Sequence, residues 1–125
     1  MDKKILIIED EIGIANAFKK QLILKGGFEI DLALGGAEGI EKMKSQKYDL
    51  VFLDLIMPDI DGLTVLETVS AHRKRYNNPS IIILTNVTST DLQRELKKHK
   101  IINFIIKTDV DIETVVDNFF ISSSD

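Results

Sequence analysis

Five polar residues in this chain have side chains suited to binding a metal ion and a phosphoryl group. Three are the carboxylates of Glu9, Asp10 and Asp54, and the other two are Thr85 and Lys107. Carboxylates that lie together raise one another's pKa, and a divalent cation relieves that repulsion. Their hard oxygen ligands suit Mg²⁺ (or Mn²⁺), which often shares its coordination with a phosphate. A lysine ammonium and a threonine hydroxyl suit the oxygens of a phosphoryl group.

Each of these residues follows a short apolar run of the kind that forms a buried parallel strand. The runs are 5–8, 50–53, 81–84 and 101–106. They are rich in β-branched residues, as strands covered on both faces are. Because the carboxyl ends of parallel strands line the ligand-binding edge of an open sheet, we expect the five side chains to meet at that edge.

Segments with helical periodicity lie between the apolar runs, and their order predicts the fold. They fall within 11–25, 37–43, 63–69, 88–99 and 112–119, and the alternating segment 28–33 is typical of a strand near an edge of the sheet. Five strand–helix alternations predict an α/β, doubly wound (βα)5 fold with a five-stranded parallel sheet. We expect the flavodoxin-like order 2-1-3-4-5, which sets strands 1 and 3 side by side.

Two of the predicted helices carry further expectations. The segment 88–99 has only Leu92 and Leu96 on its buried stripe, so this helix should be weakly anchored. For the last helix, Thr108 or Asp109 is the candidate N-cap because a short polar side chain there can accept a backbone N–H.

Composition limits the classes of protein to which this chain can belong. It has 125 residues, a formal net charge of −4 and no cysteine. The missing cysteines exclude thiol catalysis and cysteine metal sites, and the negative charge argues against direct nucleic-acid binding. No stretch approaches the roughly 18 apolar residues of a membrane span, so we expect a cytoplasmic protein. Residues 1–121 are expected to form one domain, and the polar segment 122–125 resembles the start of a linker.

Asp54 is the best candidate nucleophile among the polar residues at the strand ends. It follows the expected central strand and faces the acidic pair Glu9 and Asp10, which would bind the metal ion directly or through water. A carboxylate in this position can accept a phosphoryl group and form a mixed anhydride, while Lys107 and the cation stabilise the transferring charge. The residues alone therefore favour phosphoryl transfer to an aspartate.

Four sequence motifs resemble the receiver domain of two-component response regulators. They read ILIIEDE, DLVFLDLIMPDIDG, IIILTN and FIIKT, and the match extends from residue 3 to about residue 121. The resemblance implies that Asp54 is the phosphoacceptor. It also implies that Glu9, Asp10 and Asp54 bind the metal ion together with the backbone carbonyl of Ile56.

The same resemblance implies a switch and a set of partners. Thr85 and Lys107 would hold the phosphoryl oxygens, and Thr85 with Phe104 would transmit phosphorylation to the surface formed by the fourth helix, the fifth strand and the last helix. A histidine kinase or a phosphotransfer protein would be the phosphodonor, and a downstream partner or a missing output domain would receive the signal. We expect a monomer or a weak phosphorylation-dependent dimer that catalyses only its own phosphorylation and dephosphorylation.

Three positions depart from the pattern of this family. Glu9 stands where aspartate is common, and Asn86 follows Thr85 where a small residue is usual, which we expect to alter the lifetime of the phosphoryl group. Thr108 follows Lys107 in place of a proline that is usually joined through a cis peptide. Because a cis bond before a non-proline residue costs about 2.5–4 kcal/mol, the loop is either trans and rearranged or strained. The direction in which Lys107 points is therefore left open.

Two other functions compete with the phosphorylation switch. One is a degenerate receiver that acts as a constitutive interaction module. The site residues that such a receiver would have lost are present here, which argues against it; they are Asp54, Asp10, Thr85 and Lys107. The other is an aspartate-nucleophile phosphohydrolase of the haloacid dehalogenase type. That class normally has a catalytic aspartate two residues after the nucleophile, where this chain has Ile56.

Overall fold

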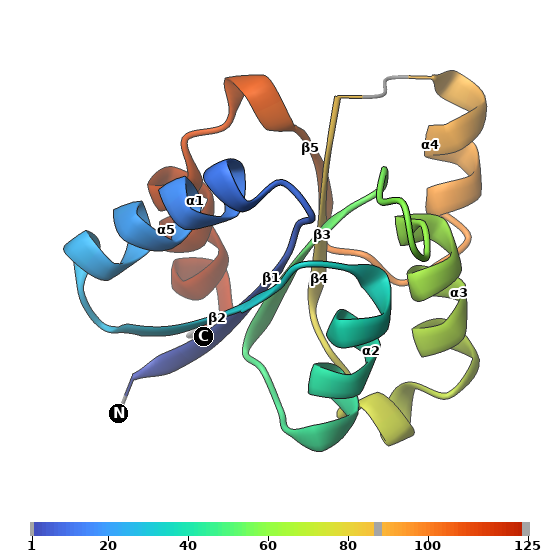
Figure 1. The fold of residues 1–125 in the computed structure, drawn as a ribbon, viewed down its shortest axis with the longest axis horizontal. Helices are drawn as coiled ribbons and strands as arrows, with labels where there is room; N and C mark the ends of the chain where they lie inside the picture. The colour runs from blue at the N-terminus through green and yellow to red at the C-terminus, as the bar shows by residue number, and fades with distance from the viewer. Residues whose placement is uncertain (1, 87–88, 124–125) are drawn as a thin grey trace.

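Five parallel strands form one sheet in the order β2-β1-β3-β4-β5 (Figure 1). The computed structural model describes residues 2–86 and 89–123. The strands are β1 (Lys3–Ile8), β2 (Phe28–Ala33), β3 (Leu50–Asp54), β4 (Ile81–Thr85) and β5 (Asn103–Ile106). This order and the edge position of β2 confirm the predicted flavodoxin-like fold.

Helices cover both faces of the sheet (Figure 1). They are α1 (Ile12–Lys25), α2 (Gly36–Ser45), α3 (Gly62–Ala71), α4 (Thr90–Leu96) and α5 (Ile112–Ser123), with 3₁₀ turns at η1 (Arg73–Tyr76) and η2 (Lys107–Asp109). The helices α1 and α5 cover one face and α2, α3 and α4 the other. None of the helices in the described part of the chain combines the length and the apolar character that a membrane span requires.

The sheet is buried because its central strands carry apolar side chains on both faces. Every residue of β3 and of β4 is buried. In β1, Ile5 and Ile7 pack in the core under α1 and α5, whereas Leu6 and Ile8 pack in the core on the opposite face. Because successive side chains of a strand point to opposite faces, the residues of β1 contribute alternately to the two cores.

The ends of the helices differ from the predictions in places. The helix α4 begins at Thr90, where Ser89 accepts the N–H of Leu92, and it ends at Leu96, so it is shorter than predicted; Thr88 lies outside the described residues. The predicted N-cap of α5 is wrong. The carboxylate of Asp111 accepts both the N–H and the hydroxyl of Thr114. Thr108 and Asp109 belong to the η2 turn, which begins at Lys107 and precedes the helix.

The C-terminal segment and the bond after Lys107 can also be compared with the predictions. The helix α5 extends to Ser123, two residues into the segment predicted as a polar tail, and Ser124 and Asp125 lie outside the described residues. No peptide bond in the described part of the chain is cis. The bond between Lys107 and Thr108 is therefore trans, and the loop is rearranged as a 3₁₀ turn.

Candidate functional site

The ends of β1 and β3 bring three carboxylates together. These strands are neighbours with Ile8 paired to Leu53, so the residues that follow leave the sheet at the same edge. Oxygen atoms of Glu9, Asp10 and Asp54 lie within 4.8 Å of one another. The side chains of Glu9 and Asp54 are buried, and Asp10 is half-buried. The predicted acidic cluster is therefore present at the predicted edge.

Lys107 lies against this cluster from the end of β5. Its Nζ donates to Glu9 Oε1 at 2.6 Å and to Asp54 Oδ2 at 3.2 Å. Burial alone would lower the pKa of Lys107, but the two carboxylates outweigh burial and raise it. Burial raises the pKa of Glu9 to about 7, although the ammonium of Lys107 opposes that rise. The ammonium of Lys107 thus pairs with two of the three clustered carboxylates, and a divalent cation would bring the missing positive charge.

The loop after β3 forms a wall of an open hollow beside Asp54. This hollow has a volume of about 470 Å³, and its lining includes Asp10, Asp54, Ile56, Asn86 and Lys107. The backbone N–H of Ile56 points to Asp54 Oδ1 at 3.4 Å. Asp54 is therefore a buried residue whose side chain borders an open hollow.

Gly62 allows the first turn of α3 to lie directly behind Asp54. A Cβ atom on Gly62 would be 2.3 Å from the carbonyl oxygen of Asp54 and 2.6 Å from the Cα of Leu55. Asp61 starts this helix, because its Oδ1 accepts the N–H of Thr64 at 2.8 Å. Asp61 and Gly62 together thus fix α3 against the carboxyl end of β3.

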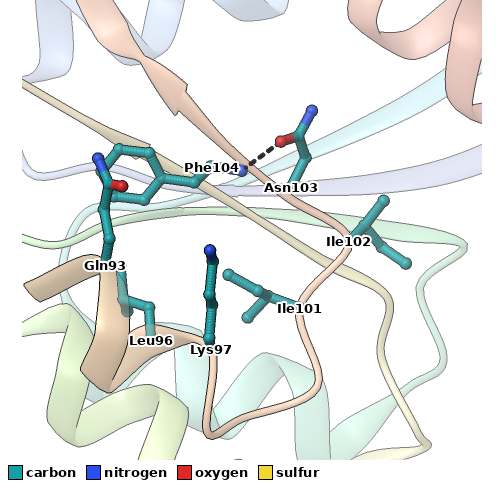
Figure 2. Close-up of a pocket in the computed structure, with 7 residues that line it drawn as sticks. All are labelled: Gln93, Leu96, Lys97, Ile101, Ile102, Asn103 and Phe104. Carbon is teal, nitrogen blue, oxygen red and sulfur yellow. Dashed lines mark hydrogen bonds between the residues drawn. The ribbon is translucent and has the colours of Figure 1, made fainter. Parts of the chain in front are cut away.

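The two predicted switch residues lie on neighbouring strands. Thr85 ends β4 and is fully buried, and Phe104 in β5 is half-buried against the core on the α4 side of the sheet. Phe104 also lines a hollow of about 460 Å³ between β5 and α4. Figure 2 shows the ring of Phe104 among the residues that line this hollow, which include Gln93, Leu96 and Lys97. The placement is compatible with the predicted switch, which itself remains a prediction.

Three contacts near the site were not predicted from the sequence. Asn86 Oδ1 accepts the backbone N–H of Thr108 at 3.2 Å. Glu9 Oε2 accepts the N–H of Glu11 at 3.3 Å. Asp59, in the loop after β3, accepts the N–H groups of Gly36 and Ala37 at 3.1 Å each and so caps α2. The first contact joins two of the three departures from the family pattern, Asn86 and Thr108, which the sequence alone left unconnected.

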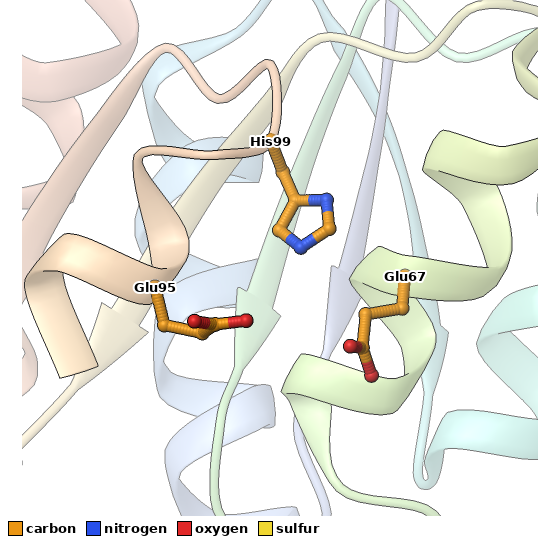
Figure 3. Close-up of side chains that lie close together, drawn as sticks. All are labelled: Glu67, Glu95 and His99. Atoms are coloured by element: carbon orange, nitrogen blue, oxygen red, sulfur yellow. The ribbon is translucent and has the colours of Figure 1, made fainter.

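A second group of metal-ligand types lies away from the strand ends. Glu67 on α3, Glu95 on α4 and His99 after α4 have ligand atoms within 4.8 Å of one another (Figure 3). Glu95 is paired with Lys98 at 2.9 Å, and His99 Nδ1 lies 3.1 Å from Ser70 Oγ. These contacts already provide polar partners for two of the three residues, and the second joins the segment after α4 to α3.

Comparisons with known proteins identify the family. The model of the response regulator receiver domain matches residues 5–118. The response regulator ArlR of Staphylococcus saprophyticus is 35% identical over 88 residues, which cover 70% of this chain and 38% of the relative. The transcriptional regulatory protein DltR of Streptococcus agalactiae is 39% identical over 87 residues, which cover 70% of this chain and 37% of that protein. The chain thus spans less than two fifths of the length of these curated relatives.

Solved structures agree with this result. A CheY-like receiver domain protein from Methanospirillum hungatei has a TM-score of 0.84 at 24% identity, over 98% of this chain and 94% of that chain, which shows the fold. The response regulator TrrA of Thermotoga maritima, solved in complex with Mg²⁺ and BeF, has a TM-score of 0.75 at 32% identity, over 94% of this chain and 96% of that chain. The chain belongs to the family of response regulator receiver domains, the phosphorylatable aspartate switches of two-component signalling.

Proposed function

We propose that this chain is a phosphorylation-controlled switch whose phosphoacceptor is Asp54. The observation that carries the proposal is the position of the Asp54 carboxylate. It lies at the end of the central strand, opens to the hollow, is close to two further carboxylates and accepts a hydrogen bond from Lys107. In the proposed step, a carboxylate oxygen attacks phosphorus and the bond between phosphorus and the donor breaks. The donor leaves with the electron pair, and an aspartyl phosphate remains.

The acidic cluster is the proposed site of Mg²⁺ (or Mn²⁺). Glu9, Asp10 and Asp54 would hold the ion with the backbone carbonyl of Ile56, and the bound ion would neutralise charge on the transferring group. The donor set supports this proposal, because oxygen atoms of three carboxylates lie within 4.8 Å of one another and Lys107 is paired with only two of them, Glu9 and Asp54. The relative TrrA, solved with Mg²⁺ and BeF, gives independent support.

Lys107 and Thr85 are the residues proposed to hold the phosphoryl oxygens. Phosphorylation adds roughly −1.5 to −2 charges and three acceptor oxygens. The added charge and acceptors would attract the hydroxyl of Thr85 and the ammonium of Lys107 toward Asp54. Phe104 would respond to the movement of Thr85 and change the surface formed by α4, β5 and α5. That surface includes the hollow beside α4 (Figure 2), where a downstream partner or an output domain would detect the change.

The proposed phosphodonor is a histidine kinase or a phosphotransfer protein in the cytoplasm. The curated relatives ArlR and DltR are named as a response regulator and a transcriptional regulatory protein, and both are much longer than the matched region. An output domain outside the present sequence is therefore part of the proposal. We further propose that the receiver is a monomer or a weak phosphorylation-dependent dimer.

Incubation with acetyl phosphate and Mg²⁺, followed by intact mass measurement, tests the proposal. We expect the protein to gain one labile phosphoryl group, and Asp54→Asn to gain none. Asp91→Asn, which changes an exposed residue of α4, is the matched control and should behave as the unaltered protein. A protein that takes up no phosphoryl group would favour the constitutive interaction module, and rapid turnover of many phosphomonoesters would favour the phosphohydrolase.

A further inference from the structure

Asn86 and Thr108 form a hydrogen bond between the two loops that carry the proposed phosphoryl-binding residues. Asn86 directly follows Thr85, and Thr108 directly follows Lys107. The side-chain oxygen of Asn86 accepts the backbone N–H of Thr108 at 3.2 Å. Two of the three residues at which this sequence departs from the family pattern are therefore partners of one another.

The bond lies where the pairing of the sheet ends. The last residues paired between β4 and β5 are Thr85 and Ile106, and beyond them β5 continues into the η2 turn. A proline at position 108 would have no N–H to donate, and a small residue such as alanine at position 86 would have no side-chain oxygen to accept that N–H. The side chain of Asn86 thus extends the connection between the two strands by one step beyond the backbone ladder.

The position of the η2 turn matters because Lys107 is its first residue. The Nζ of Lys107 is closer to Glu9, at 2.6 Å, than to Asp54, at 3.2 Å. To bind a phosphoryl group on Asp54, this ammonium must move away from Glu9. If the backbone of the turn is fixed, only the side chain has to move, and the geometry of the transfer step is largely preorganised.

We propose that Asn86 is a positioning residue that holds the Lys107 turn through the N–H of Thr108 and so sets the rate of phosphorylation at Asp54. This proposal rests on the proposed function of Asp54 as phosphoacceptor. Loss of the acceptor oxygen releases the turn, and Lys107 then remains with Glu9 for a larger fraction of the time. The effect acts through the backbone of Thr108 and does not require its side chain.

A double-mutant cycle with acetyl phosphate and Mg²⁺ tests the coupling. Asn86→Ala should slow phosphorylation by about threefold to tenfold, the effect of one ordinary hydrogen bond. Thr108→Ala keeps the N–H and should leave the rate unchanged. Thr108→Pro removes the N–H, so Asn86→Ala should cause no further slowing in that background. An equal slowing by Asn86→Ala in both backgrounds, or no slowing in either, would overturn the proposal.

Amide hydrogen exchange provides a test that needs neither phosphorylation nor the proline variant. In the absence of a phosphodonor, Asn86→Ala should accelerate exchange at the Thr108 N–H by about threefold to tenfold, while the N–H of Ile105 in β5 keeps its rate. Unchanged exchange at Thr108 would overturn the proposal. If the unaltered protein took up no phosphoryl group, the proposed function would fail, yet this exchange measurement would still decide whether Asn86 holds the turn.

Discussion

Lys107 is the residue on which the charge balance of the site depends. Its ammonium faces two nearly buried carboxylates, Glu9 and Asp54, and their attraction raises its pKa in spite of its burial. It is therefore charged whenever a phosphoryl group arrives, and it needs no proton from solvent to assist the transfer.

We expect Lys107→Ala to slow phosphorylation of Asp54 by about tenfold to a thousandfold, the cost of removing one preorganised charge from a transition state. Rates would be measured with acetyl phosphate and intact mass. The control is Lys98→Ala, which removes an exposed lysine paired with Glu95 and should leave the rate unchanged. A similar loss of rate in both variants would contradict the role given to Lys107.

Residues at strand ends could be predicted from the sequence, but contacts between loops could not. The apolar runs before Glu9, Asp54 and Lys107 predict parallel strands, and the residue after each strand lies at the same edge of the sheet. The cluster therefore follows from the order of the strands. The bond between Asn86 and Thr108 depends on the path of two loops after they leave the sheet, and periodicity carries no information about that path.

Among the secondary-structure elements, α4 has few buried anchors. Leu96 is its one buried residue, whereas α3 buries Gly62, Val65, Leu66 and Val69. A helix with so little buried surface opens at low free-energy cost, which suits an element that changes position on phosphorylation.

We expect amide protons of α4 to exchange with solvent at least about tenfold faster than those of α3, because local opening of α4 exposes little apolar surface. Hydrogen exchange followed by NMR measures both helices in one sample. Equal protection in α3 and α4 would contradict the weak anchoring of α4.

The start of α2 depends on a carboxylate from a distant loop. The N–H groups of Ala37 and Gly36 donate to Asp59, and with the N–H of Ile60 they hold the pKa of Asp59 below its ordinary value of 3.8. A lowered pKa in the folded state means that ionised Asp59 stabilises the fold above about pH 4. That contribution is lost as the pH falls through the folded-state pKa.

Asp59→Ala should therefore lower the free energy of unfolding at pH 6, and the difference from the unaltered protein should shrink as the pH is lowered to about 3. Urea unfolding at the two pH values measures this difference. A difference that stays constant with pH would show that the charge of Asp59 does not cap α2.

At the scale of the whole molecule, the site depends on close approach of α3 to the sheet. A Cβ atom at position 62 would be 2.3 Å from a backbone oxygen of Asp54, so the helix or the strand end would have to shift. Gly13 in α1 offers a matched comparison, because a Cβ atom there would have no neighbour within 4 Å.

Gly62→Ala should lower the free energy of unfolding by about 1–3 kcal/mol, the usual cost of overpacking. Gly13→Ala should raise it by up to about 1 kcal/mol, because alanine has the better helix propensity. Chemical denaturation compares the two variants. A Gly62→Ala protein as stable as the unaltered one would contradict the packing of α3 behind Asp54.

The fold could be predicted almost completely because its signals are local and repeated. Four strands follow from apolar runs and β2 from an alternating segment, each helix has its own period, and the parallel order follows from the alternation of strands and helices. The limits of α4 and α5 were less predictable, since Ser89 and Asp111 compete with other short polar residues for the cap positions. Which of them caps the helix is decided by the tertiary path of the loop.

Location of the phosphoryl group is the most direct test of the central claim. After treatment with acetyl phosphate and Mg²⁺, the aspartyl phosphate would be reduced with borohydride and the modified residue identified by peptide mass spectrometry. We predict modification at Asp54, and none when Mg²⁺ is chelated. Modification at Glu9, at Asp10 or at a residue outside the cluster, or the absence of any modification, would contradict the account.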